Sequence, residues 1–387
     1  MPLRLAPVSR HDARAEALNP ARSPLFKIRA MSTPITPPPR PMPPLVDPTS
    51  DAVSTTLSWG VAALWEQLAP LLPGLSIEVL RSVGSTNSVL LERATVRPGE
   101  RRGNAADVAR AADVGSAQVR RSVESAAFGR RAADLQPSLL VAEQQSAGRG
   151  RQGRVWQSVA GASLTFSLGV PLALRDWSGL SLAVGVALCE ALDPLGAGAS
   201  PRLALKWPND LWLVDVAAAA GADASANVSS DGASRSPARK LGGILIETVA
   251  AGPQRLAVIG IGLNVLAWGS TPAGAGLSSG FGAVCELDPA ATAPTVLARV
   301  ALPLVLALQQ FERDGFGAFA QRFAARDLLF RRAVTTTRAD LPHGIARGVS
   351  AQGELRVEAP GGAIVNVASG EVSVRLDGPP PQAALPC

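Results

Sequence analysis

The residues best suited to chemistry in this sequence form a glycine- and arginine-rich run, G-R-G-R-Q-G-R-V-W, from Gly148 to Trp156. Arg149, Arg151 and Arg154 stand among its glycines, so guanidinium groups and exposed backbone N–H groups lie close together. Such a loop can capture a phosphate or a carboxylate. A solvated loop or a nucleic-acid contact would have the same composition. The run by itself therefore leaves the ligand open.

Lysine is rare in this chain, and two of the lysines lie in short motifs. Of 37 basic residues, only Lys27, Lys206 and Lys240 are lysines. Because an ammonium and a guanidinium are not interchangeable, a lysine here indicates a place that needs a compact charge. Lys206 opens K-W-P-N-D, whose Asp210 offers a carboxylate of the kind that holds Mg²⁺ beside phosphates. A surface hairpin with a chance ion pair is the alternative, but it does not explain the lysine.

Three further segments place small or polar residues where a ligand could approach. Lys240 opens K-L-G-G-I-L-I-E, a strand pattern whose glycines permit close contact with the backbone. The segment V-I-G-I-G-L-N-V, from Val258 to Val265, predicts a strand that runs into a turn, and it fails as a dinucleotide fingerprint. Ser85-Thr86-Asn87 lies between a predicted strand and a predicted helix, where it could cap the helix or bind a small polar group.

The elements that must position these residues are intermixed helices and strands. Apolar spacing predicts helices over 57–72, 88–94, 178–195 and 295–313. Strands are predicted over 76–80, 138–143, 163–170, 203–207, 211–215, 242–249 and 255–261. Because consecutive strands are often too close for βαβ crossovers, we expect an α+β domain with a mixed or antiparallel sheet and flanking helices.

Composition divides the chain into a main domain and a small domain after it. Residues 1–52 are Pro-rich and lack apolar periodicity, so we expect a disordered tail. The main domain would span 53–326, with surface insertions at about 97–137 and 217–239. Short strands separated by turn signals predict a small β-barrel over 327–378, before a tail at 379–387; these strands are 333–337, 344–349, 355–358, 364–367 and 372–376.

Composition also argues against several functional classes. With only His11 and His343, histidine metal sites and Ser-His-Asp or Cys-His catalysis are not expected. Three widely spaced cysteines give neither a disulfide framework nor a zinc pattern. Most of the net charge of +6 lies in residues 1–50, so a face that binds polyanions is not required. With no secretory signal and no apolar run long enough to span a bilayer, we expect a soluble cytoplasmic protein.

Taken in order, these motifs resemble those of the biotin protein ligase family over roughly 57–376, with the Gly/Arg run and K-W-P-N-D as the most specific pieces. The resemblance implies a catalytic domain similar to the class II aminoacyl-tRNA synthetase core, followed by an SH3-like barrel. It implies two chemical steps: the biotin carboxylate attacks the α-phosphate of Mg-ATP to give biotinyl-5′-adenylate, and a lysine of a carrier domain then attacks this anhydride. The implied protein substrate is the biotin carboxyl carrier protein of acetyl-CoA carboxylase.

The resemblance also assigns roles to individual residues. Lys240 and Arg151 would be the catalytic residues, with the ammonium neutralising charge on the carboxylate and α-phosphate oxygens. The implied biotin contacts are Ser85, Thr86, Asn87, Gln145, Gly148, Arg149, Gly243, Leu245 and Gly260. The implied ATP contacts are Arg151, Arg154, Trp156, Asn209, Asp210, Lys240 and Asn264, with Asp210 also on the magnesium side. Trp156 could equally pack over the nucleotide or anchor the loop.

Two departures from the family and two rival functions remain. The Pro-rich tail lacks the winged helix-turn-helix of repressor members, so we expect a form without the DNA-binding domain and no DNA partner. The insertion before Lys240 is long for a hairpin. Pairing of edge strands would allow a homodimer. The closest rival is a lipoate or octanoate protein ligase, against which the Gly/Arg run and the barrel argue; the second is a nucleic-acid-binding regulator.

Overall fold

The computed structural model describes residues 57–95, 135–196, 200–215, 238–251, 254–268, 281–368 and 374–376. The predicted tails at 1–52 and 379–387 lie outside these residues, as does most of both predicted insertions. Two short parts of the predicted insertions are described. Residues 135–137 lead into one strand, and residues 238–239 begin another.

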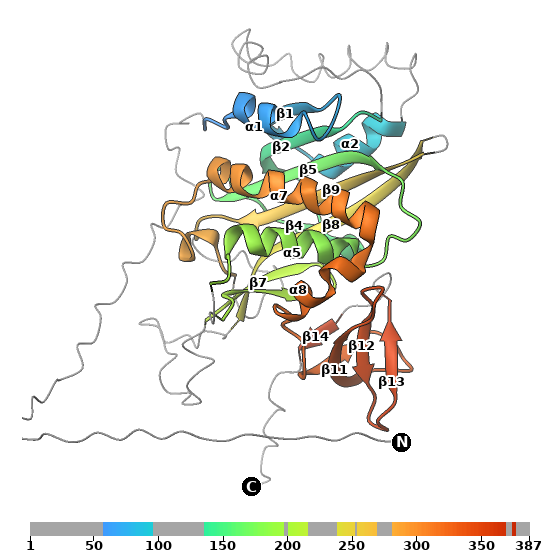
Figure 1. Ribbon diagram of the computed structural model, residues 1–387. Coiled ribbons are helices and arrows are strands. Elements are labelled where there is room, and N and C mark those ends of the chain that lie inside the picture. Colours follow the sequence, from blue (N-terminus) through green and yellow to red (C-terminus); the bar gives the residue numbers. More distant parts are fainter. Residues whose placement is uncertain are drawn as a thin grey trace, which may run out of the picture. The chain divides into compact units, whose positions relative to one another are not determined.

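A seven-stranded mixed sheet forms the main domain (Figure 1). In spatial order its strands are β1 (Ser76–Val83), β2 (Ser138–Gln145), β5 (Ser163–Leu172), β9 (Gln254–Asn264), β8 (Ala238–Ala251), β7 (Asp210–Val214) and β6 (Leu203–Lys206). Strands β1 and β2 pair in parallel, and every other neighbouring pair is antiparallel. The prediction of a mixed sheet with flanking helices is confirmed.

The alternation of residues along β5 explains why the two faces of the sheet differ. Leu164, Phe166 and Leu168 are fully buried in the main hydrophobic core. Thr165 and Ser167 point to the opposite face, since successive side chains of a strand alternate. These two residues are also buried, so this second face is covered by other parts of the protein and is polar.

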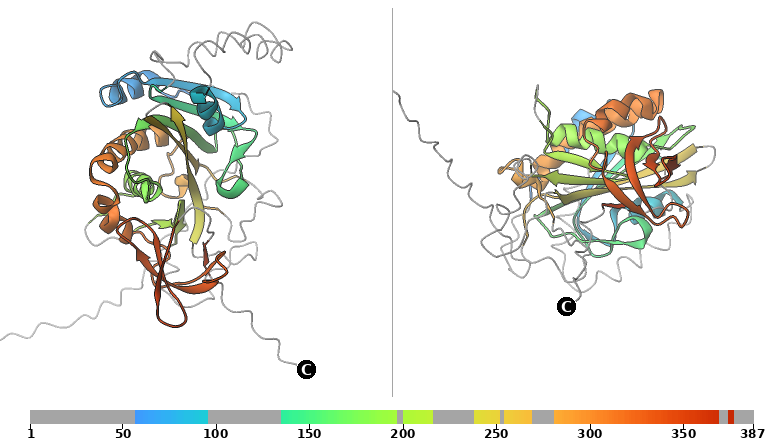
Figure 2. Two further views of the ribbon diagram at one scale, coloured as in Figure 1. Left: turned by 90° about the vertical axis from the view of Figure 1, so that its right-hand side faces the viewer. Right: turned by 90° about the horizontal axis from the view of Figure 1, so that it is seen from below.

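Helices cover both faces of the sheet, as the left view of Figure 2 shows. The main core packs α1 (Val61–Leu68), α5 (Leu180–Leu192) and α7 (Ala293–Asp314) on the first face. Helix α5 is buried almost all round because it also packs against α7. On the other face, α2 (Thr86–Thr95) contacts β2, β5, β8 and β9, with Leu90 buried among apolar residues of the sheet.

Helix α7 corrects the expectation that no apolar run could span a bilayer. Among the described residues it is the one helix that is long enough, at 22 residues, and that contains an 18-residue window with a sufficient mean hydropathy, 1.4. Half of that window is buried in the protein, and the helix packs against α5 and β5. The core helix of a globular domain has the same properties, so this helix is weak evidence for a membrane span.

The C-terminal domain is a five-stranded antiparallel sheet. Its strands, in spatial order, are β13 (Ile364–Val367), β12 (Leu355–Glu358), β11 (His343–Val349), β10 (Ala333–Thr336) and β14 (Val374–Leu376). Every second residue of β12 is fully buried, as expected for a strand with one face on a core. The described strands agree with the predicted ones to within two residues.

Short helices and a connecting segment join the two domains. After α7 come η5 (Phe316–Phe319) and α8 (Ala320–Ala324). The backbone of Arg326 and Leu328 then bonds to Leu205 at the edge of β6, with N···O distances of 2.7 and 3.0 Å. The Arg326 side chain is buried and forms a salt bridge of 3.0 Å with Asp193. This edge of the sheet is therefore covered along part of its length.

The predicted boundaries of β8 and β9 were wrong at the ends nearest the glycines of the motifs. Strand β8 begins at Ala238 rather than 242, and β9 continues to Asn264 rather than ending at 261. A turn was expected after 261, but Gly262 lies opposite Gly243 in a continuous ladder. Helix boundaries differ too: α1 spans only Val61–Leu68, and α2 begins at Thr86 rather than 88.

Candidate functional site

The polar face of the sheet has a floor of glycines, because bulky side chains lie directly against it. A Cβ atom on Gly260 would lie 2.2 Å from Oδ1 of Asn87, and one on Gly262 would lie 2.4 Å from Cε2 of Trp156. Neither distance can be accommodated without movement. Gly260 and Gly262 therefore let helix α2 and the Gly/Arg run approach the sheet closely.

The Gly/Arg run is an ordered hairpin rather than an open loop. Strand β3 (Gly148–Arg149) pairs with β4 (Val155–Trp156), and a 3₁₀ turn, η2 (Arg151–Gly153), joins them. The N–H of Gly150 donates to the carbonyl of Arg154 at 2.7 Å. Glycine is required at Gly148, since a Cβ there would lie 2.3 Å from the carbonyl oxygen of Trp156.

Trp156 anchors the hairpin to the sheet. Its indole packs against Gly262, and its Nε1 is buried with no hydrogen-bond partner among the described residues. Between the two readings that the sequence left open, this packing favours an anchor for the loop. The buried Nε1–H is nevertheless a donor that a ligand could satisfy.

A network of polar side chains surrounds the start of α2. Thr86 donates from its backbone N–H, at 2.7 Å, to Oε1 of Gln145, and its hydroxyl lies 3.2 Å from the same oxygen. Oγ of Ser167 lies 2.6 Å from Oγ1 of Thr86 and 2.6 Å from Oδ1 of Asn87. Ser85, which precedes the helix, accepts a long bond of 3.5 Å from the N–H of Ser88, so helix capping is its lesser role.

The other end of this face is ionic. Nζ of Lys240 on β8 lies 2.8 Å from Oδ1 of Asp210 on β7, and a Cβ on Gly243 would lie 3.7 Å from the ammonium. The turn that precedes Asp210 contains a cis peptide bond between Trp207 and Pro208. Lys206, the other motif lysine, instead lies over the ring of Trp212, 5.4 Å from its centroid. Of the two lysines, Lys240 forms the 2.8 Å ion pair with Asp210, and Lys206 lies opposite Asp210 in the ladder between β6 and β7.

Asn209 connects the Gly/Arg hairpin to β8. Its amide donates to the carbonyl of Ile244 at 2.8 Å, and its Oδ1 accepts a bond of 3.3 Å from Nη1 of Arg151. Burial lowers the pKa of the Arg151 guanidinium; the nearby Arg154 lowers it further, while Asp210 opposes the shift. Arg151 is therefore a partly desolvated cation at the ionic end of the site, and Arg154 is exposed.

Asn264 lies at the end of β9, and its side chain donates hydrogen bonds to backbone carbonyl groups. Its Nδ2 lies 3.2 Å from the carbonyl of Gly282 and 3.5 Å from that of Lys240, and the side chain is 5% exposed. Its predicted contact with the adenine nucleotide stays a prediction. The contacts with Lys240 and Gly282 show that it also fixes the backbone beside the catalytic lysine candidate.

The predicted site residues thus gather on one face of the sheet, in a group rich in hydroxyl and amide side chains around α2 and an ionic group around β7 and β8. Sequence reasoning missed two polar partners of the first group, Ser167 and Glu247. Glu247 accepts from Nδ2 of Asn87 at 2.9 Å and from Nη2 of Arg149 at 2.9 Å. Strand alternation could have found it, because Gly243, Leu245 and Glu247 occupy every second position of β8.

The side chains near Asp210 limit the kind of magnesium site that could form there. Among the described residues, no group of three or more His, Cys, Asp or Glu side chains could hold a metal ion. Magnesium needs fewer protein ligands when substrate phosphates supply the rest. One carboxylate oxygen of Asp210 contacts Lys240, and the other could bind the metal ion. This fits a magnesium site that is completed by substrate phosphates, but not a site made of protein ligands alone.

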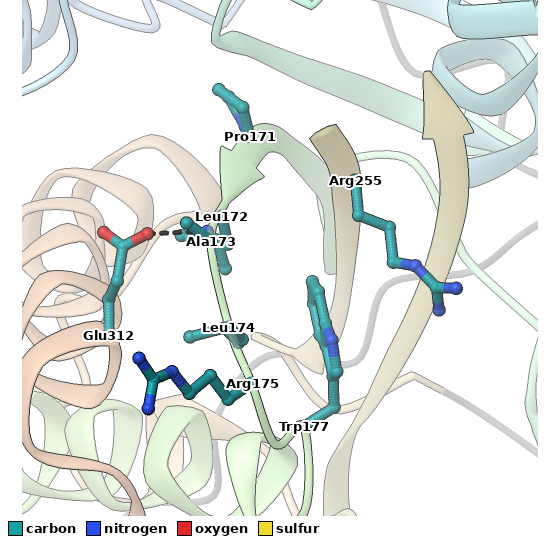
Figure 3. Close-up of a pocket in the computed structure, with 8 residues that line it drawn as sticks. All are labelled: Pro171, Leu172, Ala173, Leu174, Arg175, Trp177, Arg255 and Glu312. Carbon is teal, nitrogen blue, oxygen red and sulfur yellow. Dashed lines mark hydrogen bonds between the residues drawn. The ribbon is translucent and has the colours of Figure 1, made fainter. Parts of the chain in front are cut away.

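A pocket of about 570 Å³ lies elsewhere on the domain, at the end of β5 and β9 remote from Asn264 (Figure 3). It is lined by Pro171, Leu172, Ala173, Leu174, Arg175, Trp177, Arg255 and Glu312. Glu312 accepts a bond of 2.7 Å from the N–H of Ala173, and the charged side chains are exposed. None of the predicted site residues lines this pocket, so it is not the candidate site.

Comparison with known proteins assigns the chain to a family. Residues 129–264 match the Biotin/lipoate A/B protein ligase family, and residues 332–375 match the Biotin protein ligase C terminal domain. A biotin–acetyl-CoA-carboxylase ligase from Mycobacterium tuberculosis is 33% identical over 259 residues, which cover 62% of this chain and 80% of that protein. The chain belongs to the biotin protein ligase family.

Two further biotin protein ligases are similar to this chain, one in sequence and one in structure. The bifunctional ligase/repressor BirA of Salmonella typhimurium is 33% identical over 239 residues, which cover 61% of this chain and 66% of the relative, just under two thirds of its length. The solved structure of the biotin protein ligase from Aquifex aeolicus in complex with biotin and ATP superposes with a TM-score of 0.52 at 22% identity, over 78% of this chain and 99% of that one. The sequence similarity to BirA supports membership of the family, and the superposition on the Aquifex aeolicus structure shows a shared fold.

Proposed function

We propose that this chain is an ATP-dependent, AMP-forming ligase that attaches biotin to a lysine of a biotin carrier protein through biotinyl-5′-adenylate. The observation that carries the proposal is the division of one sheet face into an end rich in hydroxyl and amide groups and an end that holds the Lys240–Asp210 ion pair. Biotin has the same division, with a neutral ureido ring at one end and a carboxylate at the other. Membership of the biotin protein ligase family supports the same assignment.

The end rich in hydroxyl and amide groups is suited to the ureido group. Thr86, Asn87 and Gln145 present hydroxyl and amide groups that can both donate and accept, and Thr86 and Asn87 are almost fully buried. Buried polar groups of this kind discriminate strongly against ligands that leave them unpaired. The other proposed biotin contacts are Ser85, Gly148, Arg149, Gly243, Leu245 and Gly260.

The ionic end is suited to the reaction. A biotin carboxylate oxygen attacks the α-phosphorus, the bond from phosphorus to the bridging oxygen breaks, and pyrophosphate leaves. Lys240 and Arg151 would neutralise the charge on the carboxylate and phosphoryl oxygens, and their partners Asp210 and Asn209 hold them in place beforehand. The carrier lysine then attacks the acyl carbon as an uncharged amine, AMP leaves, and the amine loses its proton. Arg154, Trp156, Asn209, Asp210 and Asn264 complete the proposed ATP site.

Magnesium, when bound, would supply further neutralisation of the phosphate charge. The residue that fits this role is Asp210, through the carboxylate oxygen that Lys240 does not occupy. The remaining ligands would come from the substrate phosphates and water.

The proposal extends to finer properties of the protein. The main domain would be similar to the class II aminoacyl-tRNA synthetase core, and the C-terminal domain would be an SH3-like barrel. The carrier would be the biotin carboxyl carrier protein of acetyl-CoA carboxylase, in the cytoplasm. Among the described strands, β1 pairs on one side only, and its other side could pair with a second copy to form a homodimer.

The direct test is transfer of biotin to a purified carrier domain. We expect incorporation that requires ATP and the acceptor lysine, read as a mass increase of the carrier. Calorimetric titration with biotin and with lipoate separates the proposal from its closest rival. Tighter binding of lipoate, or transfer of lipoate in place of biotin, would overturn the proposed substrate.

A further inference from the structure

One carboxylate links helix α2, strand β8 and the Gly/Arg hairpin. Oε2 of Glu247 accepts from Nδ2 of Asn87 at 2.9 Å, and Oε1 accepts from Nη2 of Arg149 at 2.9 Å. Each oxygen of the carboxylate thus holds a different element. Arg149 also donates from Nη1 to Oγ of Ser88 at 3.3 Å, so its guanidinium bridges β8 and α2.

These contacts complete a chain of hydrogen-bonded side chains that starts and ends at the hairpin. Gln145 lies three residues before Gly148 and binds Thr86, which contacts Ser167, which in turn contacts Asn87. Asn87 binds Glu247, and Glu247 binds Arg149 on the first strand of the hairpin. The base of the hairpin is therefore held on both sides by one network.

The two contacts of Glu247 differ in the strength expected of them. Asn87 is 3% exposed, so its bond to a carboxylate is shielded from water and is of the strong, charge-assisted kind. The side chain of Arg149 is 47% exposed, so its ion pair is weakened by solvent. Asn87 also has little freedom to move, because it packs directly on Gly260.

Resting on the proposed function, we infer that Glu247 is a positioning residue for biotin binding: it holds Asn87 against the glycine floor and holds Arg149 above it. It does not touch the reacting atoms in this role, because the ionic pair of Lys240 and Asp210 lies further along β8. Loss of Glu247 should weaken biotin binding and loosen the hairpin, while leaving adenylate chemistry nearly unchanged.

The test compares Glu247→Gln with Glu78→Gln. The first variant keeps the size of the side chain and can still accept one of its two bonds. The second removes the charge from a similar pair, Glu78 with Arg93, which joins β1 to the same helix α2 at 2.7 Å and lies outside the network. In biotin-dependent pyrophosphate exchange we expect Glu247→Gln to raise KM for biotin about tenfold, since it loses one charge-assisted bond, with kcat changed by less than about threefold.

Hydrogen exchange of the backbone amides gives a second readout that needs no ligand. Amides of residues 148–156 should exchange faster in Glu247→Gln than in the wild type, whereas Glu78→Gln should match the wild type in exchange and in KM. An unchanged KM for biotin, a fall in kcat alone, or unchanged hairpin exchange would each overturn the inference. If the wild type shows no biotin-dependent exchange of pyrophosphate, the proposed function fails, while amide exchange still tests the hold of Glu247 on the hairpin.

Discussion

The indole Nε1 of Trp207 donates a buried hydrogen bond of 3.1 Å to the carbonyl oxygen of Gly353. Trp207 lies in K-W-P-N-D, two residues before Asn209, and Gly353 lies in the turn between β11 and β12 of the C-terminal domain. The same turn packs on the start of α5, where a Cβ on Gly353 would lie 2.7 Å from Cα of Gly179. The C-terminal domain therefore contacts the segment that carries the ionic end of the site.

Gly353→Ala should separate or strain this junction. The new Cβ collides with backbone, and φ is +77°, a conformation that costs an alanine roughly 1–2 kcal/mol. We expect a loss of at least that size in urea unfolding. Trp207→Phe should cost about 1–3 kcal/mol, because it leaves the Gly353 carbonyl buried without its donor. Gly361→Ala, which meets no atom within 4 Å, is the matched control, and equal stability of all three variants would contradict the junction.

Gly262→Ala should displace the Trp156 indole and with it the Gly/Arg hairpin. The added Cβ would lie 2.4 Å from the ring, so we expect a higher KM for biotin and for ATP. Trp156→Ala makes room for the methyl group, so the double variant should be less impaired than the sum of the two single variants predicts. Strict additivity in this cycle would show that the two residues do not meet as described. Gly317→Ala, which meets no neighbour, controls for the effect of an added methyl group.

Lys240 and Arg151 should act on adenylate formation. We expect Lys240→Ala and Arg151→Ala to reduce biotin-dependent pyrophosphate exchange by about 10²–10³-fold, the usual loss when one preorganised charge or donor is removed. Arg175→Ala, in the pocket remote from the site, is the control and should retain activity. Wild-type exchange in either alanine variant would remove that residue from the proposed catalytic pair.

Asp327, in the connection between the domains, should make stability depend on pH. Burial raises its pKa from 3.8 to about 6, against the opposing effects of the Leu329 and Phe330 amides and of Arg332. The folded protein then binds this proton more tightly than the unfolded chain, so the free energy of unfolding should fall as pH rises from about 4 to about 6. The shift corresponds to about 3 kcal/mol.

Asp327→Asn removes this titration while keeping the oxygen that accepts from the Leu329 N–H. Relative to the wild type, the variant should gain stability when the pH is raised from 4.5 to 7, as measured by urea unfolding at each pH. A constant difference between the two proteins across this range would show that Asp327 does not titrate there.

The sequence predicted much of the fold because alternation and helical spacing act locally. The strands with clear alternation, such as β5, were placed almost to the residue, and the C-terminal strands likewise. Prediction failed where a long-range partner decides the conformation. A turn was expected after 261, and the pairing of Gly262 with Gly243 on β8 keeps this segment extended.

The same distinction applies to the candidate site. Lys240, Asp210 and Arg151 were found from residue type and motif, and the structure brings them to one end of a face. Ser167 was missed because a serine within an apolar strand has no signature until its neighbours Thr86 and Asn87 are known. Glu247 was missed because its partners lie about a hundred residues or more away in the chain.

Strands β7 and β8 pair directly at Val214 and Ala238, although residues 215–237 separate them in sequence. Ladder pairing therefore sets the register of Asp210 and Lys240, whatever chain connects the two strands. Because the entropy of closing a loop rises only with the logarithm of its length, this connection should accept replacement by segments of other sizes. It offers a place at which a tag, a reporter or a second protein could be inserted beside the candidate site.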